Sequence, residues 1–119
     1  MGEVLKRDME VIRNLLLWME EQDEGLFIYQ MLPPMPDYES SMEHVQMLIS
    51  AGYVDQTAQK SFRISWEGHE FLDKVRDDEI WRKTKEGASS LGSWSVKILG
   101  ELASGYIRAK AAELGLPLA

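Results

Sequence analysis

Apolar residues recur every three or four positions near the start of this chain, the spacing of a helix with one buried face. The apolar face predicted over residues 6–22 consists of Met9, Ile12, Leu15, Leu16 and Met19. Residues 26–32 are apolar almost throughout, and their Phe, Ile and Tyr favour a short strand. Prolines at 33, 34 and 36 then predict a stiff, extended connection.

A second amphipathic helix is predicted over residues 39–51, where Met42, Val45, Leu48 and Ile49 would face inward. Ser40 or Ser41 is the expected N-terminal cap, because Ser40 with Glu43 matches the capping-box spacing. Gly52 is the expected stop. Tyr53 and Val54 then begin a strand that leads into a polar turn.

The pattern changes to strict alternation in Ser61–Trp66, which predicts a returning strand with Phe62, Ile64 and Trp66 on its buried face. Ser65 can cap a following helix, and Gly68 would let its first turn lie close to another backbone. The expected core joins Trp66, Phe71 and Leu72 to three residues of the earlier helices, namely Leu15, Leu48 and Ile49. Asp77 or Asp78 would cap a further helix if the chain bends there.

Small residues follow this region, and residues 87–93 are predicted to be a hinge between a domain at 1–86 and a C-terminal segment at 94–119. A last helix is expected over 94–113. Its ridge of Trp94, Ile98, Leu102 and Tyr106 predicts packing across a homodimer, because an isolated helix of this kind is marginal.

The order helix, strand, helix, hairpin, helix is that of a winged helix, so the predicted fold class is α+β, mostly α, with an appended C-terminal helix. Three stretches, KRDMEVIRNLLL, HVQMLISAGYV and WEGHEFLDKVRDDEIW, resemble an uncharacterised bacterial family often encoded in prophages. This resemblance covers about residues 6–86. It implies a winged-helix-like fold and a bacterial or phage origin, and it supplies no catalytic residues.

The chain departs from a full helix-turn-helix motif, because LFIYQMLPPMPD occupies the place of the second helix. The methionines and tyrosines around these prolines fit two interpretations, a plug for the core or an adaptable interface. The residues concerned are Tyr29, Met31, Met35 and Tyr38.

Charge decides between the functions that a winged helix suggests. The net charge of −7 is concentrated in residues 1–40, which carry nine acidic and three basic side chains, a net −6. The outward residues predicted on the 39–51 helix include no Arg or Lys, although phosphate neutralisation supplies most non-specific DNA affinity. The expected partner- or DNA-binding residues are Glu43, His44, Gln46, Met47 and Ser50 of the helix, with Lys60 of the wing at 55–61 and Arg63 on the strand that follows it.

No catalytic constellation is visible. His44 and His69 are the histidines, and neither belongs to a metal-ligand pattern; the chain has no cysteine, so no disulfide forms. Asp77, Asp78 and Glu79 point to different faces of a helix and do not converge. No enzyme activity, cofactor, metal or membrane span is expected, and the location is predicted to be cytoplasmic.

The favoured function is therefore a non-enzymatic module that binds protein, including a second copy of itself. A DNA-binding transcriptional regulator is the first alternative, and a phage-encoded acidic inhibitor of a host system is the second. The sequence predicts no small-molecule substrate.

Overall fold

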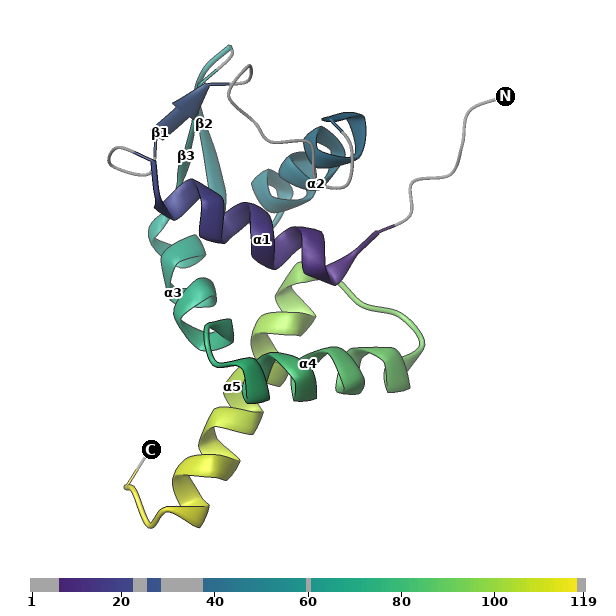
Figure 1. The fold of residues 1–119 in the computed structure, drawn as a ribbon, viewed down its shortest axis with the longest axis vertical. Coiled ribbons are helices and arrows are strands. Elements are labelled where there is room, and N and C mark those ends of the chain that lie inside the picture. Colours follow the sequence, from purple (N-terminus) through teal and green to yellow (C-terminus); the bar gives the residue numbers. More distant parts are fainter. Residues whose placement is uncertain (1–6, 23–25, 29–37, 60, 118–119) are drawn as a thin grey trace. The chain divides into compact units, whose positions relative to one another are not determined.

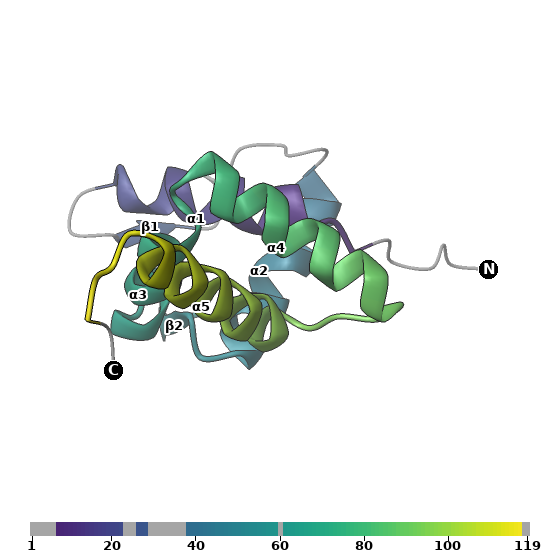
Figure 2. The same cartoon turned by 90° about the horizontal axis from the view of Figure 1, so that it is seen from below.

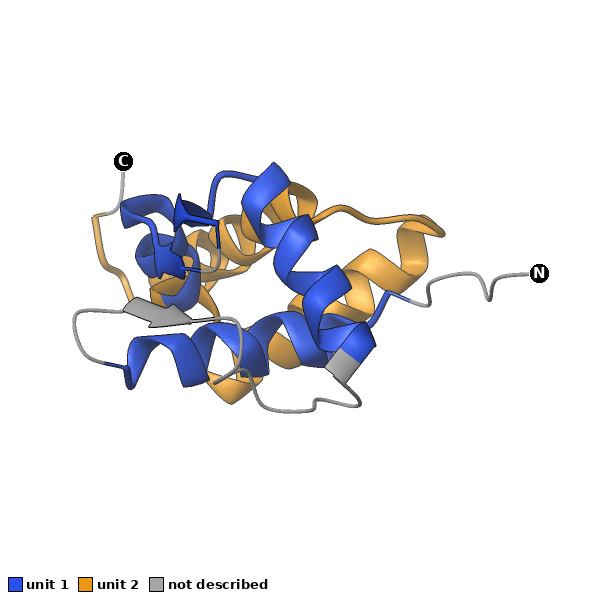
Figure 3. Ribbon diagram, turned by 90° about the horizontal axis from the view of Figure 1, so that it is seen from above, with its two compact units in different colours: residues 1–72 blue, residues 73–119 orange. Residues whose placement is uncertain are grey.

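A computed structural model describes residues 7–22, 26–28, 38–59 and 61–117 of the chain. The chain divides into two compact units, residues 1–72 and residues 73–119 (Figure 3). The fold is α+β and mostly helical, with a β-hairpin between helices and a C-terminal helix, in a winged-helix-like layout (Figure 1). The predicted fold class is confirmed.

Unit 1 begins with helix α1, Met9–Glu20, which starts where Asp8 accepts a hydrogen bond from the Glu10 N–H at 2.9 Å. The predicted apolar face is confirmed except at Met9, which is half-buried. The fully buried side chains of this face are Ile12, Leu15, Leu16 and Met19. Helix α1 packs against helix α2, Tyr38–Ser50, and against a small antiparallel sheet.

Helix α2 starts earlier than predicted, so the capping role given to Ser40 or Ser41 is wrong. Both serines lie inside the helix, and Ser41 is completely buried. The end was predicted correctly, because Gly52 takes a φ of +84°, which an L residue adopts only at a cost. The Tyr53 N–H then donates to the Leu48 carbonyl at 2.9 Å and closes the helix.

The sheet has the order β1-β3-β2, formed by Leu26–Ile28, Ser61–Ile64 and Val54–Ala58. Phe27 pairs with Phe62 and Val54 pairs with Ile64, so the short first strand joins the hairpin. The turn expected at 55–60 is shorter than predicted, because Asp55, Gln56 and Ala58 pair with β3 through their backbone and the register shifts between Gln56 and Ala58. The side chains of residues 55–58 are exposed. The proline segment lies outside the described residues.

Helix α3, Trp66–Val75, crosses the division between the units, which lies after Leu72. Asp77 caps the next helix, α4, Asp78–Leu91. The predicted linker at 87–93 is wrong for residues 87–91, which form the last turns of α4. The small residues in these turns allow helix α5, Val96–Glu113, to pack closely against α4. A Cβ placed at Gly87 would lie 2.5 Å from the Tyr106 hydroxyl of α5.

Unit 2 is built from α4 and α5, which lie side by side (Figure 2). Gly92, at a φ of +79°, ends α4, and Ser95 caps α5 by accepting from the Ile98 N–H at 3.2 Å. The buried side chains of this unit are Val75 at the end of α3, Ile80, Trp81, Thr84 and Ala88 of α4, and Val96, Leu99, Ala103 and Ala111 of α5.

Candidate interaction surface

Only some of the residues predicted to face outward on α2 are exposed to solvent. Gln46 and Ser50 are exposed, Glu43 and Met47 are half-buried, and His44 is completely buried. The prediction that His44 points outward is therefore wrong. No Lys or Arg occurs between Tyr38 and Ser50, so the exposed strip of α2 presents no cation to a phosphate backbone.

His44 instead fastens α2 to the start of α1. Its Nδ1 lies 2.7 Å from the Ser40 carbonyl oxygen, and its Nε2 lies 2.9 Å from the Asp8 backbone nitrogen. A carbonyl only accepts and an amide N–H only donates, so Nδ1 carries the proton and Nε2 accepts. This arrangement uses both ring nitrogens inside the fold and leaves neither for a ligand.

The wing contributes Arg63, which is exposed on β3 and pairs through its backbone with Asp55 and Leu26. Lys60 was predicted beside it but lies outside the described residues. The neighbouring side chains of the hairpin, at residues 55–59, are exposed and include one charge, the Asp55 carboxylate. Arg63 is thus the cation among the described residues of the hairpin.

Trp66 is the main departure from the predicted core. Its side chain is 75% exposed, although Phe62 and Ile64 are buried as predicted. The reason is that β3 ends at Ile64: Ser65 starts a helix, so the alternation no longer sets the direction of residue 66. Ile49, also assigned to the core, is half-exposed, whereas Phe71, Leu72, Leu15 and Leu48 are buried as predicted.

Ser65 fixes the backbone immediately before Trp66. Its N–H donates to the Tyr53 carbonyl at 2.9 Å, and its hydroxyl donates to the Gly52 carbonyl at 2.6 Å. The same oxygen accepts from the Gly68 N–H at 3.0 Å, which confirms its predicted capping role. Trp66 therefore extends from a rigid junction between the end of α2 and the start of α3.

Gly68 holds this junction tight, as its sequence position predicted. A Cβ at residue 68 would collide with the Tyr53 carbonyl oxygen and would lie 2.8 Å from Ile64 Cγ1. On the same face of α3, three residues further along, the Phe71 ring stacks on Tyr53, with centroids 5.0 Å apart. One face of the start of α3 thus packs against Tyr53 and Ile64, while Trp66 lies on the exposed face.

Two carboxylates accompany the exposed indole. Glu67 follows it in the first turn of α3, and Glu70 lies one turn further along the same face. Both are exposed, and neither forms an ion pair with a described residue. We call Trp66, Glu67 and Glu70 the Trp66 surface. The sequence contained a signal for it, because a capping serine at 65 already implies that the strand stops before residue 66.

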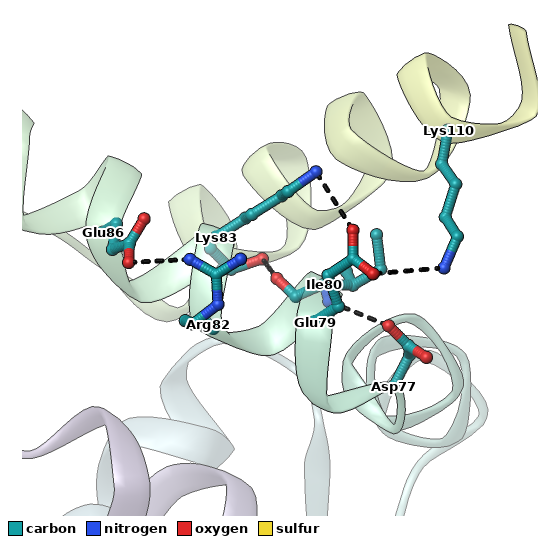
Figure 4. Close-up of polar contacts among 8 residues, drawn as sticks. Asp77, Glu79, Ile80, Arg82, Lys83, Glu86 and Lys110 are labelled. Carbon is teal, nitrogen blue, oxygen red and sulfur yellow. Dashed lines mark hydrogen bonds and ion pairs between the residues drawn. The ribbon is translucent and has the colours of Figure 1, made fainter. Parts of the chain in front are cut away.

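Unit 2 carries a separate charge cluster on α4 and α5 (Figure 4). The Glu79 carboxylate lies 3.3 Å from Lys83 Nζ and 3.7 Å from Lys110 Nζ, so it links the two helices. The hydrogen bond from Lys83, followed by the charge of Lys110, lowers the pKa of Glu79. The Ile80 N–H, at 3.0 Å from Asp77 Oδ2, lowers the pKa of Asp77, and Lys110 adds to that effect. These groups stabilise helix ends and do not converge on a site.

The ridge predicted to form a dimer is half-buried within unit 2. The ridge residues Trp94, Ile98, Leu102 and Tyr106 are all half-exposed, and Leu102 and Tyr106 face Gly87 of α4. Helix α4 thus supplies cover that the sequence argument had assigned to a second copy. Dimer formation through the remaining surface stays a prediction.

The described part of the chain contains no group of three or more His, Asp or Glu side chains that could hold a metal ion. Among those same residues no helix has the length and apolar character needed to cross a membrane. Every buried side-chain nitrogen and oxygen within the described ranges has a hydrogen-bond partner.

Comparison with known proteins places these features in a family context. A family model described as "Hypothetical protein (DUF2513)" matches residues 6–95, which include the three stretches that carried the sequence resemblance. An "Uncharacterized protein" of Haemophilus influenzae is 33% identical over 92 residues, covering 68% of this chain and 76% of the relative. No solved structure matches the chain.

Proposed function

The chain belongs to the DUF2513 family, and we propose that it is a non-enzymatic module that binds another protein through the Trp66 surface. The observation that carries this proposal is the exposure of Trp66, 75%, on a junction fixed by three hydrogen bonds of Ser65. Tryptophan is enriched among the residues that dominate binding energy at protein interfaces, and a rigid anchor loses little conformational entropy on binding.

Charge supports a protein partner over a nucleic acid. Residues 1–72 carry thirteen acidic and five basic side chains, a net −8, whereas residues 73–119 carry seven acidic and eight basic ones, a net +1. A phosphate backbone would meet repulsion from unit 1, which contains α2, the hairpin and Trp66.

The test is capture of partners from a lysate of the bacterium that encodes the chain, with and without nuclease. Wild type is compared with Trp66→Ala and with Leu91→Ala, since Leu91 is an exposed apolar residue of unit 2 and serves as the matched control. We expect partners that resist nuclease, are lost with Trp66→Ala and are kept with Leu91→Ala. Partners that vanish with nuclease would instead support the regulator.

A DNA-binding regulator is the second candidate, favoured by the winged-helix-like layout and by the exposed Gln46 and Ser50, which are able to contact base edges. It would use these residues with Arg63 and Lys60. A third candidate, an acidic inhibitor of a host system, draws support from the charge of unit 1. We infer a bacterial or phage origin, which the Haemophilus relative supports.

A further inference from the structure

We infer that the Trp66 surface receives an arginine-containing segment of its partner protein, with the guanidinium over the indole and between Glu67 and Glu70. This inference rests on the proposed function and specifies the chemistry of the partner. Its starting point is that Trp66, Glu67 and Glu70 are all exposed and form no ring contact or ion pair with any other described residue.

The composition of the surface selects a cation. An exposed indole face attracts a guanidinium through the ring quadrupole, and Arg stacks on Trp more often than Lys does. The carboxylates of Glu67 and Glu70 are acceptors that match the planar donor fork of Arg. A planar nucleobase would also stack on Trp66, but its phosphates would be repelled by the same two carboxylates.

The ends of α2 and α3 near Trp66 do not reverse the negative charge that Glu67 and Glu70 give this surface. Ser65, which precedes Trp66, donates to the Gly52 carbonyl at the C-terminal, negative end of α2, and the last turn of α2 contains no basic residue. The positive end of α3 lies at the same junction but is already met by Glu67 in its first turn. Glu70 therefore remains as a full charge without a described counter-ion.

None of the described cations near this surface forms an ion pair with Glu67 or Glu70. Lys74, one turn beyond Glu70 on α3, is half-buried and forms no ion pair with a described residue. Arg76, just beyond the end of α3, is paired with Asp73 at 2.9 Å. Arg63, on β3, has an interaction of its own. With unit 1 at a net −8, a basic segment would also be attracted at long range, which raises its association rate.

The experiment is an NMR titration of the full chain labelled with ¹⁵N, using a blocked pentapeptide Gly-Arg-Leu-Arg-Gly and its twin with Glu in place of Arg. We expect saturable shifts of the Trp66 indole N–H and of the backbone amides of residues 66–70, with the Arg peptide alone. Trp66→Ala should weaken binding at least about fivefold, the Glu67→Gln/Glu70→Gln pair should weaken it as well, and Leu91→Ala should leave it unchanged.

Several results would overturn the inference. The first is the absence of any shift at millimolar peptide. The second is shifts of equal size at the backbone amides of acidic residues throughout both units. The third is binding that survives Trp66→Ala in a protein whose spectrum shows that it is still folded. Shifts of the Trp66 indole with protein concentration alone would indicate a second copy as occupant, and stronger shifts with a thymidine oligonucleotide would indicate nucleic acid. If the peptide fails while lysate partners still depend on Trp66, the basic partner is wrong and the proposed function stands; if both fail, both are wrong.

Discussion

Trp66 and Phe71 are five residues apart on α3 and have opposite surroundings. Phe71 is 1% exposed and stacks on Tyr53, whereas Trp66 is 75% exposed. The difference arises because a helix rotates by about 100° per residue, so five residues place side chains on opposing faces. Exposure of the larger aromatic is therefore set by where the helix begins, at Ser65, and not by the hydrophobicity of the side chain.

We expect Phe71→Ala to destabilise the protein by about 3–5 kcal/mol, because it removes a buried ring and leaves a cavity. Trp66→Ala should change the free energy of unfolding by no more than about 0.5 kcal/mol, because the ring is mostly in water already. Urea unfolding followed by circular dichroism measures both variants. A loss below about 1 kcal/mol for Phe71→Ala would contradict the packing of α3.

Gly68 and Gly105 are both helical glycines, and they make a matched pair for a second prediction. Gly68→Ala should destabilise by about 1–3 kcal/mol, since its new methyl group would meet the Tyr53 carbonyl and Ile64 Cγ1. Gly105→Ala meets nothing within 4 Å and should stabilise α5 by about 0.4–1 kcal/mol. Thermal unfolding of the two variants tests the pair, and equal effects would show that the close approach at Gly68 is not tight.

At the scale of elements, the positions where helices begin and end account for most of the correct predictions and most of the errors. Periodicity located α1, α2, α3 and the hairpin, and local chemistry placed the stops and caps at Gly52, Ser65 and Asp77 correctly. The errors came where tertiary contact overrides local preference. Ser41 lies buried within α2, and Gly87 lies under Tyr106 within α4, so neither behaves as cap or linker.

The candidate site shows the same limit. Gln46, Ser50 and Arg63 were predicted to be accessible and are exposed, because simple helix and strand geometry decides that. His44 was assigned to the same face and is buried, because its bond to the Asp8 N–H depends on α1. No rule based on residues near 44 in the sequence would find a partner 36 residues away.

His44 therefore supports a prediction about how α1 and α2 are joined. His44→Ala should destabilise by about 1–3 kcal/mol, because the Asp8 N–H and the Ser40 carbonyl lose a buried partner. His69→Ala is the control, since the half-buried His69 ring has no described side-chain partner. Ring ¹⁵N shifts should identify the Nδ1–H tautomer of His44 in the folded protein. The opposite tautomer would be incompatible with these two hydrogen bonds.

The N-terminal end of α4 supports a prediction about pH. Asp77 has a lowered pKa in the folded state, so it stabilises the folded form above its ordinary pKa of 3.8, and this contribution is lost as the pH falls through the lower folded value. Asp77→Asn keeps an oxygen that accepts from the Ile80 N–H but removes the charge. The difference in melting temperature between wild type and Asp77→Asn should be largest near pH 7 and should shrink towards zero in strong acid. A difference that grows in acid would contradict this sign.

At the scale of the whole molecule, charge is divided unequally between the two units. Unit 1 has a net −8 and contains every element that a winged helix would present to DNA, while unit 2 is close to neutral at +1. The fold and the charge thus favour different partners. A winged-helix-like layout alone indicates where a partner would bind, and the side chains on that surface determine which chemistry it accepts.

We therefore expect weak DNA binding with little sequence preference at physiological salt. Arg63 and Lys60 of the hairpin, with Lys6 and Arg7 before α1, allow two to four phosphate contacts, which predicts a log–log salt slope of about −2 to −4. Fluorescence anisotropy with duplexes from the upstream region of the chain's own gene, across a salt series, measures that slope. Lys97→Ala, an exposed cation of unit 2, is the control for Lys60→Ala. A nanomolar affinity that survives competitor DNA, falls with Gln46→Ala or Lys60→Ala and is unchanged by Lys97→Ala would make the DNA-binding regulator the better account of this surface.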